Sequence, residues 1–406
     1  MTISFSCIEQ NCSKDFEFSE QYIGRQTNCP LCGKVVIVPT KTVADCQKRM
    51  YGTRDKSIFT FDIQMRFAMT QDDHDGVQFF EWLFNQRRSP DGKINGKDIN
   101  AKDNTPYKGC GTFMNVAAFS GHIGIMECLK RYGARVDVPN NDGDMPIHQA
   151  ASAGNPKVIA WLVNKNGVDI NVRGQGGRTA LHTAAFHGKS GCIQLMKEEL
   201  NADLNIRDTD GNSAMDYAAL QGQIASITCL AVLEPGLVEA RDADGLTSMH
   251  RAAAMGQTAC IECLANLGAK IEVKDARGRT PMYLAAQTGQ TACIEFLHRM
   301  GAKVEADCGP SPNDDVTPML GALETGQIAS IQCLVRLGAS VNFTDRTGMS
   351  FIHYAAAGGQ IPSLECLKNL GARLDIRSNK GKTALDLAIQ YGQTEAAEWL
   401  RRNGVR

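Results

Sequence analysis

The chain has 406 residues and is almost neutral, with 43 Lys and Arg against 44 Asp and Glu. Hydrophobic residues make up 43% of it, enough for a buried core, and charged residues make up 21%, which excludes disorder throughout. The balanced charge argues against a protein that coats nucleic acid or membranes. The longest apolar run, residues 158–163, is far shorter than the ~18 residues of a membrane span. Residues 1–7 lack the features of a secretory signal, so we expect a cytoplasmic protein without membrane insertion.

Four cysteines near the N-terminus form two close pairs, Cys7 with Cys12 and Cys29 with Cys32. Two such pairs, separated by a short strand-forming stretch, place four thiolates around one tetrahedral zinc ion. A segment this small does not bury a core, and a bound metal supplies the missing folding free energy. We therefore predict one structural zinc ion held by these four residues. The alternative is four reduced or disulfide-paired cysteines in an unstructured tail.

This segment resembles the small zinc ribbons found at the N-termini of many bacterial proteins. The resemblance rests on the run Cys-Pro-Leu-Cys-Gly-Lys at residues 29–34, on Ile-Ser-Phe-Ser at residues 3–6 and on Val-Val-Ile-Val-Pro at residues 35–39. It implies a β zinc-ribbon-like domain over residues 1–40, with a metal site that has no open catalytic position. The first pair departs from the usual spacing, because four residues rather than two separate its cysteines. A linker is expected over residues 41–58.

From residue 103 onward the chain repeats itself, mostly every 33 or 34 residues. The residues that open successive units are usually Thr or Ser: Thr112, Met145, Thr179, Ser213, Thr247, Thr280, Thr317, Ser350 and Thr383. A near-fixed period of this length predicts a stacked solenoid rather than globular domains. Within each unit, an N-capping residue, an alanine pair, a terminating glycine and an apolar stripe predict two short antiparallel helices.

The units resemble ankyrin repeats, whose motif G-x-T-P-L-H-x-A-A is matched by residues 177–185 and 278–286. About nine units fill residues 103–406, and a degenerate capping repeat is expected at residues 59–102. The resemblance implies an all-α solenoid of helix-turn-helix units with β-turn tips, which binds proteins through its concave face.

Several residues of chemical interest are interpreted as structural. Eight cysteines occupy two register positions of the apolar stripe and are expected in the core: Cys128, Cys192, Cys229, Cys260, Cys263, Cys293, Cys333 and Cys366. Four histidines of the repeat motif are expected to hydrogen-bond within the units: His148, His182, His250 and His353. No phosphate loop or hydrolase motif occurs, so we predict no enzymatic activity. A cysteine-dependent enzyme would need Cys110 or Cys308, which flank the lengthened turns at residues 104–111 and 308–315; we interpret them as exposed loop thiols.

The binding face is predicted from the positions that follow each alanine pair, which have no packing role. In the first half of the solenoid these positions hold apolar residues in a line, next to a histidine on the same face: Phe119, Phe186, Leu220, Met255 and His187. Exposed apolar patches with aromatic anchors commonly mark interfaces. The alternative is that these side chains fold over neighbouring repeats. A partly basic rim at the turn tips would favour an acidic peptide: Arg178, Arg277, Arg279, Arg346, Lys380 and Lys382.

These features together predict a monomeric, non-enzymatic scaffold that binds a protein or peptide partner. A nucleic-acid-associated regulator that uses the zinc ribbon is the main alternative, although residues 1–58 carry no strongly cationic footprint. A second alternative follows from the bacterial character of the ribbon: an effector that an intracellular bacterium delivers into a host cell.

Overall fold

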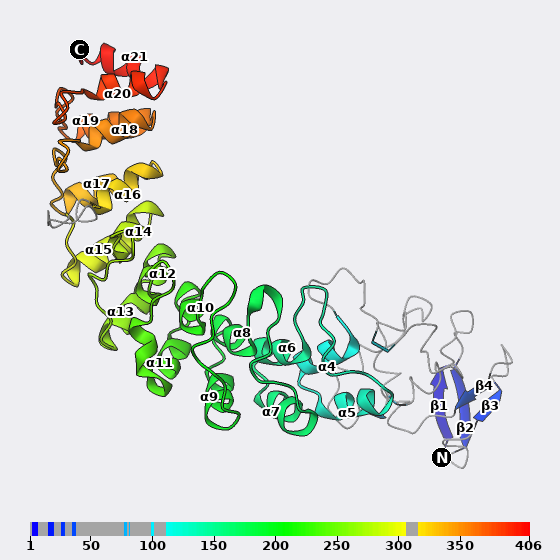
Figure 1. Ribbon diagram of the computed structural model, residues 1–406. Helices are drawn as coiled ribbons and strands as arrows, with labels where there is room; N and C mark the ends of the chain where they lie inside the picture. Colours follow the sequence, from blue (N-terminus) through cyan, green and yellow to red (C-terminus); the bar gives the residue numbers. More distant parts are fainter. Residues whose placement is uncertain are drawn as a thin grey trace. The chain divides into compact units, whose positions relative to one another are not determined.

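The computed structural model describes residues 77–78, 81, 99–100, 111–305 and 316–406 in full, and the backbone of four N-terminal strands (Figure 1). The chain divides into two compact units. The first comprises Met1–Ala184 and Gln194–Asp203, and the second comprises Ala185–Ile193 and Leu204–Arg406. None of the helices in this described part is long and apolar enough to cross a membrane.

The N-terminal strands form two antiparallel pairs. β1 (Thr2–Ser6) pairs with β2 (Asp15–Ser19), and β3 (Gln26–Asn28) pairs with β4 (Val35–Ile37). The predicted zinc ligands fall outside the described residues: Cys7, Cys12, Cys29 and Cys32. The same holds for the linker at residues 41–58 and for both loop cysteines, Cys110 and Cys308.

The first unit contains successive helical hairpins. The first hairpin is α4 (Phe113–Ser120) with α5 (Ile123–Arg131). In the second, α6 (Pro146–Ala153) is followed by α7 (Pro156–Ala160), which continues as the π-helical turn η3 (Trp161–Lys165). The short 3₁₀ turn η4 (Gln175–Gly177) precedes the hairpin of α8 (Ala180–Phe186) and α9 (Ser190–Glu198), whose residues are divided between the two units.

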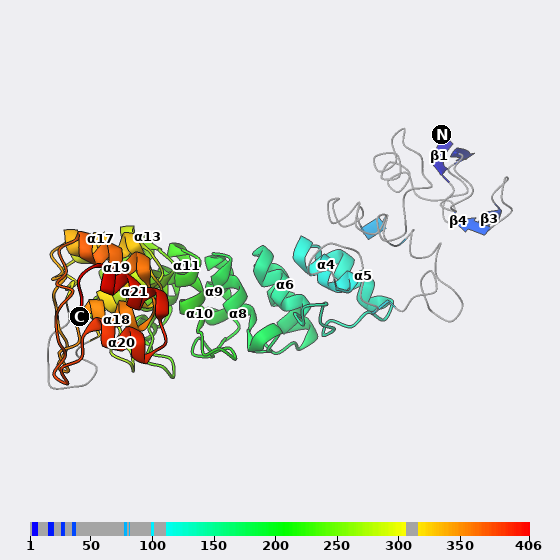
Figure 2. The ribbon, with the colours of Figure 1, turned by 90° about the horizontal axis from the view of Figure 1, so that it is seen from above.

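The second unit continues the same pattern. Its hairpins are α10 (Ala214–Leu220) with α11 (Ile224–Leu233), α12 (Ser248–Ala254) with α13 (Thr258–Asn266), α14 (Pro281–Gln287) with α15 (Thr291–Arg299), α16 (Pro318–Glu324) with α17 (Ile328–Arg336), α18 (Phe351–Ala357) with α19 (Ile361–Asn369), and α20 (Ala384–Gln390) with α21 (Thr394–Arg402). A 3₁₀ turn, η5 (Pro235–Glu239), follows α11. First helices of the hairpins pack on first helices and second on second, so this unit has two helical layers (Figures 1 and 2).

Local sequence explains where the helices begin. Thr112, Ser213 and Thr383 each accept a hydrogen bond from the backbone N–H three residues later, which satisfies an otherwise unpaired donor. Proline occupies the first turn of α14 and α16, where its missing N–H costs nothing. These sequence-predicted starts are confirmed.

A glycine follows each first helix of the described repeats, and several of these glycines lie against a side chain of the next repeat. Gly256, after α12, has φ +76°, a left-handed conformation that favours glycine. A Cβ atom there would lie 2.4 Å from Oε1 of Gln290, the residue before α15. In the same way Asn155 Nδ2 donates to the carbonyl of Phe119, at 2.7 Å. The close approach of this amide is a second reason for glycine.

The core lies between the two helical layers. The alanine pairs of the first helices and the isoleucines of the second are fully buried, as in Ala252, Ala253 and Ile261. Six of the eight predicted core cysteines are buried: Cys128, Cys192, Cys260, Cys293, Cys333 and Cys366. Cys229 and Cys263 are half-buried, so the core prediction was too strong for these two.

In several repeats a backbone N–H group at the end of the repeat bonds to a polar side chain of the repeat before it. Asn171 Oδ1 accepts from the Asp203 N–H at 3.0 Å, and Asn342 Oδ1 accepts from the Arg373 N–H at 2.8 Å. Asn100 Oδ1 accepts from the Arg135 N–H at 2.8 Å in the same manner. The described residues before position 111 thus contact the first hairpin as one repeat contacts the next.

Candidate binding surface

Phe119 is the apolar residue that stands out on the first unit. It lies near the end of α4 and is 51% exposed. Its carbonyl accepts the Asn155 amide, so the backbone is held while the ring faces solvent.

Arg178, also in this unit, donates from Nε to the Gln175 carbonyl at 3.1 Å and from Nη2 to Gln175 Oε1 at 2.7 Å. Its guanidinium therefore lies against its own turn.

The predicted apolar residues of the second unit differ in exposure. Met255 is 50% exposed, as an anchor requires. Phe186 is half-buried: its ring packs edge-on against Tyr217, with centroids 5.9 Å apart, and against the exposed His187, with centroids 4.9 Å apart. Leu220 is also half-buried. The interpretation that the side chain folds over a neighbouring repeat therefore applies to Phe186.

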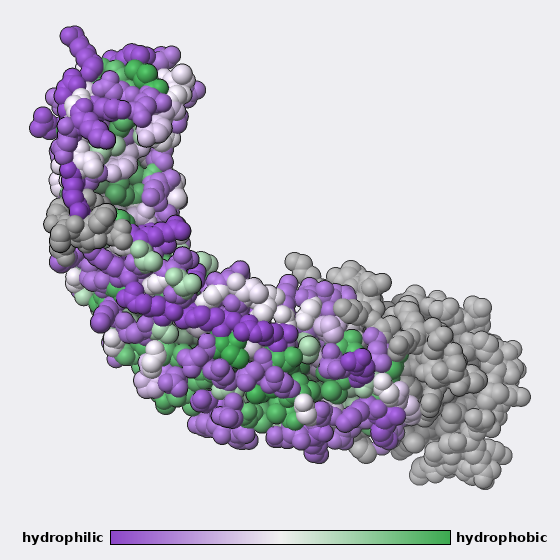
Figure 3. Space-filling model, in the orientation of Figure 1, coloured by the Kyte–Doolittle hydropathy of each residue, from purple (hydrophilic) through white to green (hydrophobic). Residues whose placement is uncertain are grey.

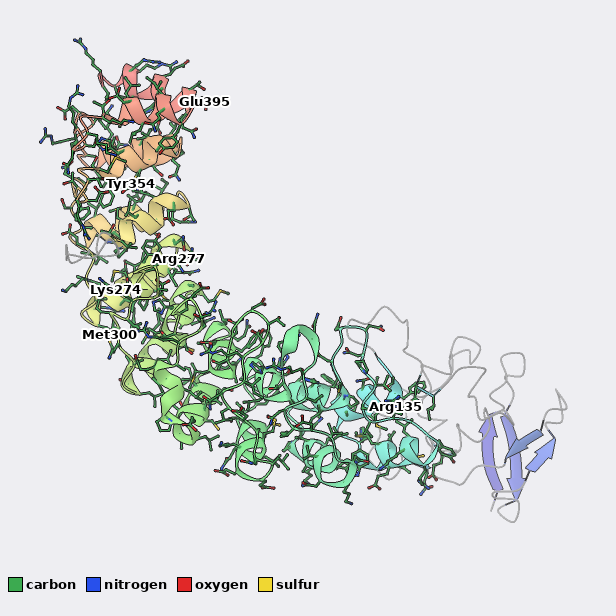
Figure 4. All side chains as sticks on the ribbon, viewed as in Figure 1. Arg135, Lys274, Arg277, Met300, Tyr354 and Glu395 are labelled. Carbon is green, nitrogen blue, oxygen red and sulfur yellow. The ribbon has the colours of Figure 1, made fainter. Side chains whose placement is uncertain are left out.

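Arg279 closes a turn in the second unit. Its Nε pairs with Asp275 Oδ2 at 2.7 Å, and its side chain is only 18% exposed. Asp275 also accepts from the backbone N–H groups of Arg277 and Arg279. This carboxylate thus neutralises Arg279 locally, whereas Arg277 is exposed at the same turn (Figure 4).

Sequence reasoning missed other exposed apolar residues. Ile389 and Tyr391, at the end of α20, are 53% and 59% exposed, and Val232 on α11 is 73% exposed. Figure 3 shows hydrophobic residues interspersed with hydrophilic ones on the face in view. A residue-by-residue comparison would have found Val232, because most other second helices carry Arg, Asn or Glu at this register.

The motif histidines form a buried hydrogen-bond network. Nδ1 of His250 accepts from the Thr247 N–H at 3.2 Å, and Nε2 donates to the Arg279 carbonyl at 3.0 Å. His148 and His353 make the same two contacts in their own repeats. Backbone N–H groups only donate and carbonyls only accept, so these rings are neutral with the proton on Nε2. His182 Nδ1 likewise accepts from the Thr179 N–H at 3.1 Å, so the predicted hydrogen bonding within the units is confirmed for all four histidines.

Family models decide the identity of this repeated architecture. A model described as ankyrin repeats (3 copies) matches residues 225–308 and 319–406, and one described as ankyrin repeats (many copies) matches residues 116–163 and 147–197. These matches cover more than half of the chain. The chain belongs to the ankyrin-repeat family.

Solved ankyrin domains are similar to this chain. The human ASB11 ankyrin repeat domain is 25% identical, with a TM-score of 0.44; the match covers 55% of this chain and 98% of that one. The ankyrin repeat domain of Bcl-3, titled a unique member of the IkappaB protein family, is 21% identical, with a TM-score of 0.42; the match covers 56% of this chain and 100% of that one. No curated protein matches the chain.

Burial makes several of the described ankyrin-repeat cysteines poorly reactive. Burial raises the pKa of Cys260 and of Cys293 to about 11, and burial, followed by the charge of Glu81, raises that of Cys128 to about 12. These thiols stay protonated near neutral pH and are poor nucleophiles. Within the described ranges, no group of three or more His, Cys, Asp or Glu side chains is arranged to hold a metal ion.

Proposed function

We propose that the chain captures a protein or peptide partner on the exposed ends of its first helices, without catalysing a reaction. Ankyrin repeats are a general protein-interaction fold, and this family membership supports the class of function. The observation that carries the assignment to a surface is the exposure of Phe119 on the first unit and Met255 on the second.

Equivalent positions in some of the other repeats carry polar residues. Ser152 and Gln287 occupy the position of Phe119, and Gln221 and Thr288 occupy that of Met255. An apolar side chain half in water gains when a partner covers it. Full burial of such a side chain contributes ~1.5–3 kcal/mol, so covering the exposed half contributes about 1 kcal/mol for each.

Affinity capture tests this surface. The variant Phe119→Ser/Met255→Thr carries the residue types of neighbouring repeats, so its fold is expected to be unchanged. Val232→Asn is the matched control, because it removes an exposed apolar group from a second helix. Partners recovered with wild type and with the control should be lost with the double variant. Recovery of the same partners by all three proteins would refute the assignment.

We also propose that Cys7, Cys12, Cys29 and Cys32 hold one structural zinc ion. Each cysteine pair lies in sequence between the two strands of one antiparallel pair, and four thiolates are a donor set that zinc prefers. Elemental analysis of the full chain should find one zinc ion per molecule, and Cys29→Ser/Cys32→Ser should lose it. Cys229→Ser, in a helix of the repeats, should retain it.

We propose that residues 59–102 form an N-terminal capping repeat. Support comes from Asn100, which makes the contact to Arg135 that Asn342 makes to Arg373. Glu81 pairs with Arg131 at 2.5 Å, and Glu295 pairs with Arg336 at the corresponding step between α15 and α17.

A cytoplasmic location fits the eight described cysteines, which are all free thiols.

A further inference from the structure

An open hollow of about 480 Å³ lies between the turns that precede α18 and α20. Its lining residues are Arg346, Thr347, Met349, Ser378, Asn379, Lys380, Lys382, Leu387, Gln390 and Tyr391. This volume lies within the ~300–1,000 Å³ range of ligand pockets in proteins. All ten residues belong to the second unit, so the hollow is formed within one compact body.

At the hollow, the last hairpin lacks a polar pair that three other repeats contain. In three other repeats a turn aspartate bonds to a large side chain on the first helix: Asp208 with Tyr217 at 2.6 Å, Asp242 with Arg251 at 2.8 Å, and Asp345 with Tyr354 at 2.5 Å. Ser378 and Leu387 occupy the two equivalent positions in the hairpin of α20. Their shorter side chains leave space under the turn and remove a carboxylate from it.

The hollow is cationic. Arg346, Lys380 and Lys382 line it, and none of its lining residues is acidic. The nearest turn carboxylate, Asp345, already accepts hydrogen bonds from Thr347 and from Tyr354. Asp386 accepts from the backbone and the hydroxyl of Thr383, at 2.8 and 2.9 Å. The hydrogen bonds lower the pKa of both acids, so both stay negatively charged, but the three lining cations outnumber them and the hollow keeps a net positive charge.

The walls of the hollow are held in place by backbone contacts. Asn379 Nδ2 donates to the Arg346 carbonyl at 2.7 Å, and the Asn379 N–H donates to the Thr347 carbonyl at 2.8 Å. His353 Nε2 bonds to the Lys382 carbonyl at 3.0 Å from the neighbouring repeat. A preformed site loses less entropy when it binds, so these contacts favour ligand capture.

Apolar groups lie beside the cations. Leu387 is buried, Met349 is half-buried, and Tyr391 is 59% exposed at the rim. We propose that this hollow binds an acidic peptide segment that carries one large apolar side chain. That side chain packs against Leu387 and Met349, while its neighbouring carboxylates pair with Arg346 and Lys380. The inference rests on the proposed function in that the ligand is a peptide, but it uses a different surface.

Fluorescence anisotropy tests the proposal with defined probes. The first probe is a fluorescein-labelled nine-residue peptide with a central phenylalanine and a total of four acidic residues, aspartates and glutamates, on its two sides. In the second probe the acids become asparagine and glutamine, and in the third the phenylalanine becomes serine. The acidic phenylalanine peptide should bind saturably, with affinity that falls as salt is added, because salt screens exposed charges. Each control peptide should bind at least about tenfold more weakly, the effect of a loss of ~1.4 kcal/mol.

Two variants of the full chain locate the binding. Ser378→Asp/Leu387→Tyr restores the polar pair that Asp345 and Tyr354 form one repeat earlier, so it should fill the hollow and keep the fold. It should abolish peptide binding, and Lys380→Glu should weaken it at least about tenfold. Arg277→Glu, which reverses an exposed charge at the turn before α14, is the matched control and should bind like wild type.

Three results would overturn the proposal: equal binding of all three peptides, full binding by the filled variant, or displacement of the acidic peptide by an equimolar twelve-nucleotide DNA. The variant Phe119→Ser/Met255→Thr should bind the acidic peptide as wild type does. Failure of the hollow therefore leaves the partner-capture result unchanged, and failure of partner capture leaves the peptide result unchanged.

Discussion

Mild acid should destabilise the repeats through three buried histidines, His148, His250 and His353. In each, Nδ1 accepts a backbone N–H, so a proton added there would face another donor. Burial, opposed by weaker favourable contacts, lowers the pKa of all three below the ordinary 6.5. The folded chain therefore stays neutral at these rings while the unfolded chain takes up protons.

The sign and size of the effect follow from this difference. Stability is fully present above pH 6.5, and it falls as the pH drops from 6.5 toward the folded-state pKa values. Each histidine lowers the free energy of unfolding by up to ~1.4 kcal/mol per pH unit in that window. Between pH 7.5 and pH 5.5 the three together should lower it by at most about 4 kcal/mol.

A matched variant isolates the histidines. Asn115 occupies the same motif position, where Oδ1 accepts the Thr112 N–H at 2.9 Å and Nδ2 donates to the Asp144 carbonyl at 3.3 Å. Asparagine thus makes both contacts without titrating. The variant His148→Asn/His250→Asn/His353→Asn should fold and lose most of the pH dependence.

Urea unfolding followed by circular dichroism at pH 7.5, 6.5 and 5.5 measures the effect. Carboxylates add little in this range: hydrogen bonds from Thr383, for example, lower the pKa of Asp386 below its ordinary 3.8. Equal stability of wild type at pH 7.5 and 5.5 would refute the reasoning. An unchanged slope in the triple asparagine variant would refute it as well.

Two further predictions concern packing. Gly321→Ala in α16 should destabilise the fold, since the added Cβ would lie 2.8 Å from the Tyr283 carbonyl oxygen. Gly191→Ala in α9 adds a Cβ that meets no atom within 4 Å, so it should stabilise the fold by about 0.5 kcal/mol. Thermal melts of both variants measure the difference. Cys263 should react with iodoacetamide before buried Cys260 in mass-spectrometric labelling of the native chain. Burial raises the pKa of Cys260 from the ordinary 9.0 to about 11, which lowers the thiolate fraction of Cys260 about a hundredfold. Equal effects of the two alanines, or equal labelling, would contradict these expectations.

Local signals made the repeat fold predictable. A capping residue such as Thr247 and the His250 that bonds to it are three residues apart, so the sequence alone shows both partners. The alanine pairs and cap glycines recur at fixed spacing for the same reason. Boundaries of the helices followed from these positions.

Exposure was less predictable, because it depends on neighbouring repeats. Phe186 is covered by Tyr217, which lies 31 positions further along the chain and belongs to the next first helix. The hollow also depends on two positions, Ser378 and Leu387, that are unremarkable singly and matter only as a replaced pair. Arg279 is a different case, since Asp275 lies four residues away and the ion pair between them was open to prediction.

The joint between repeats has a consequence for how this protein can change in length. In several repeats the glycine after the first helix lies against a glutamine of the next repeat: Gly188 against Gln223, Gly222 against Gln257, and Gly256 against Gln290. Because every such junction uses the same two parts, excising one whole module brings a compatible glycine and glutamine together again. Deletion of 34 residues in phase should therefore be tolerated far better than loss of a few residues out of phase.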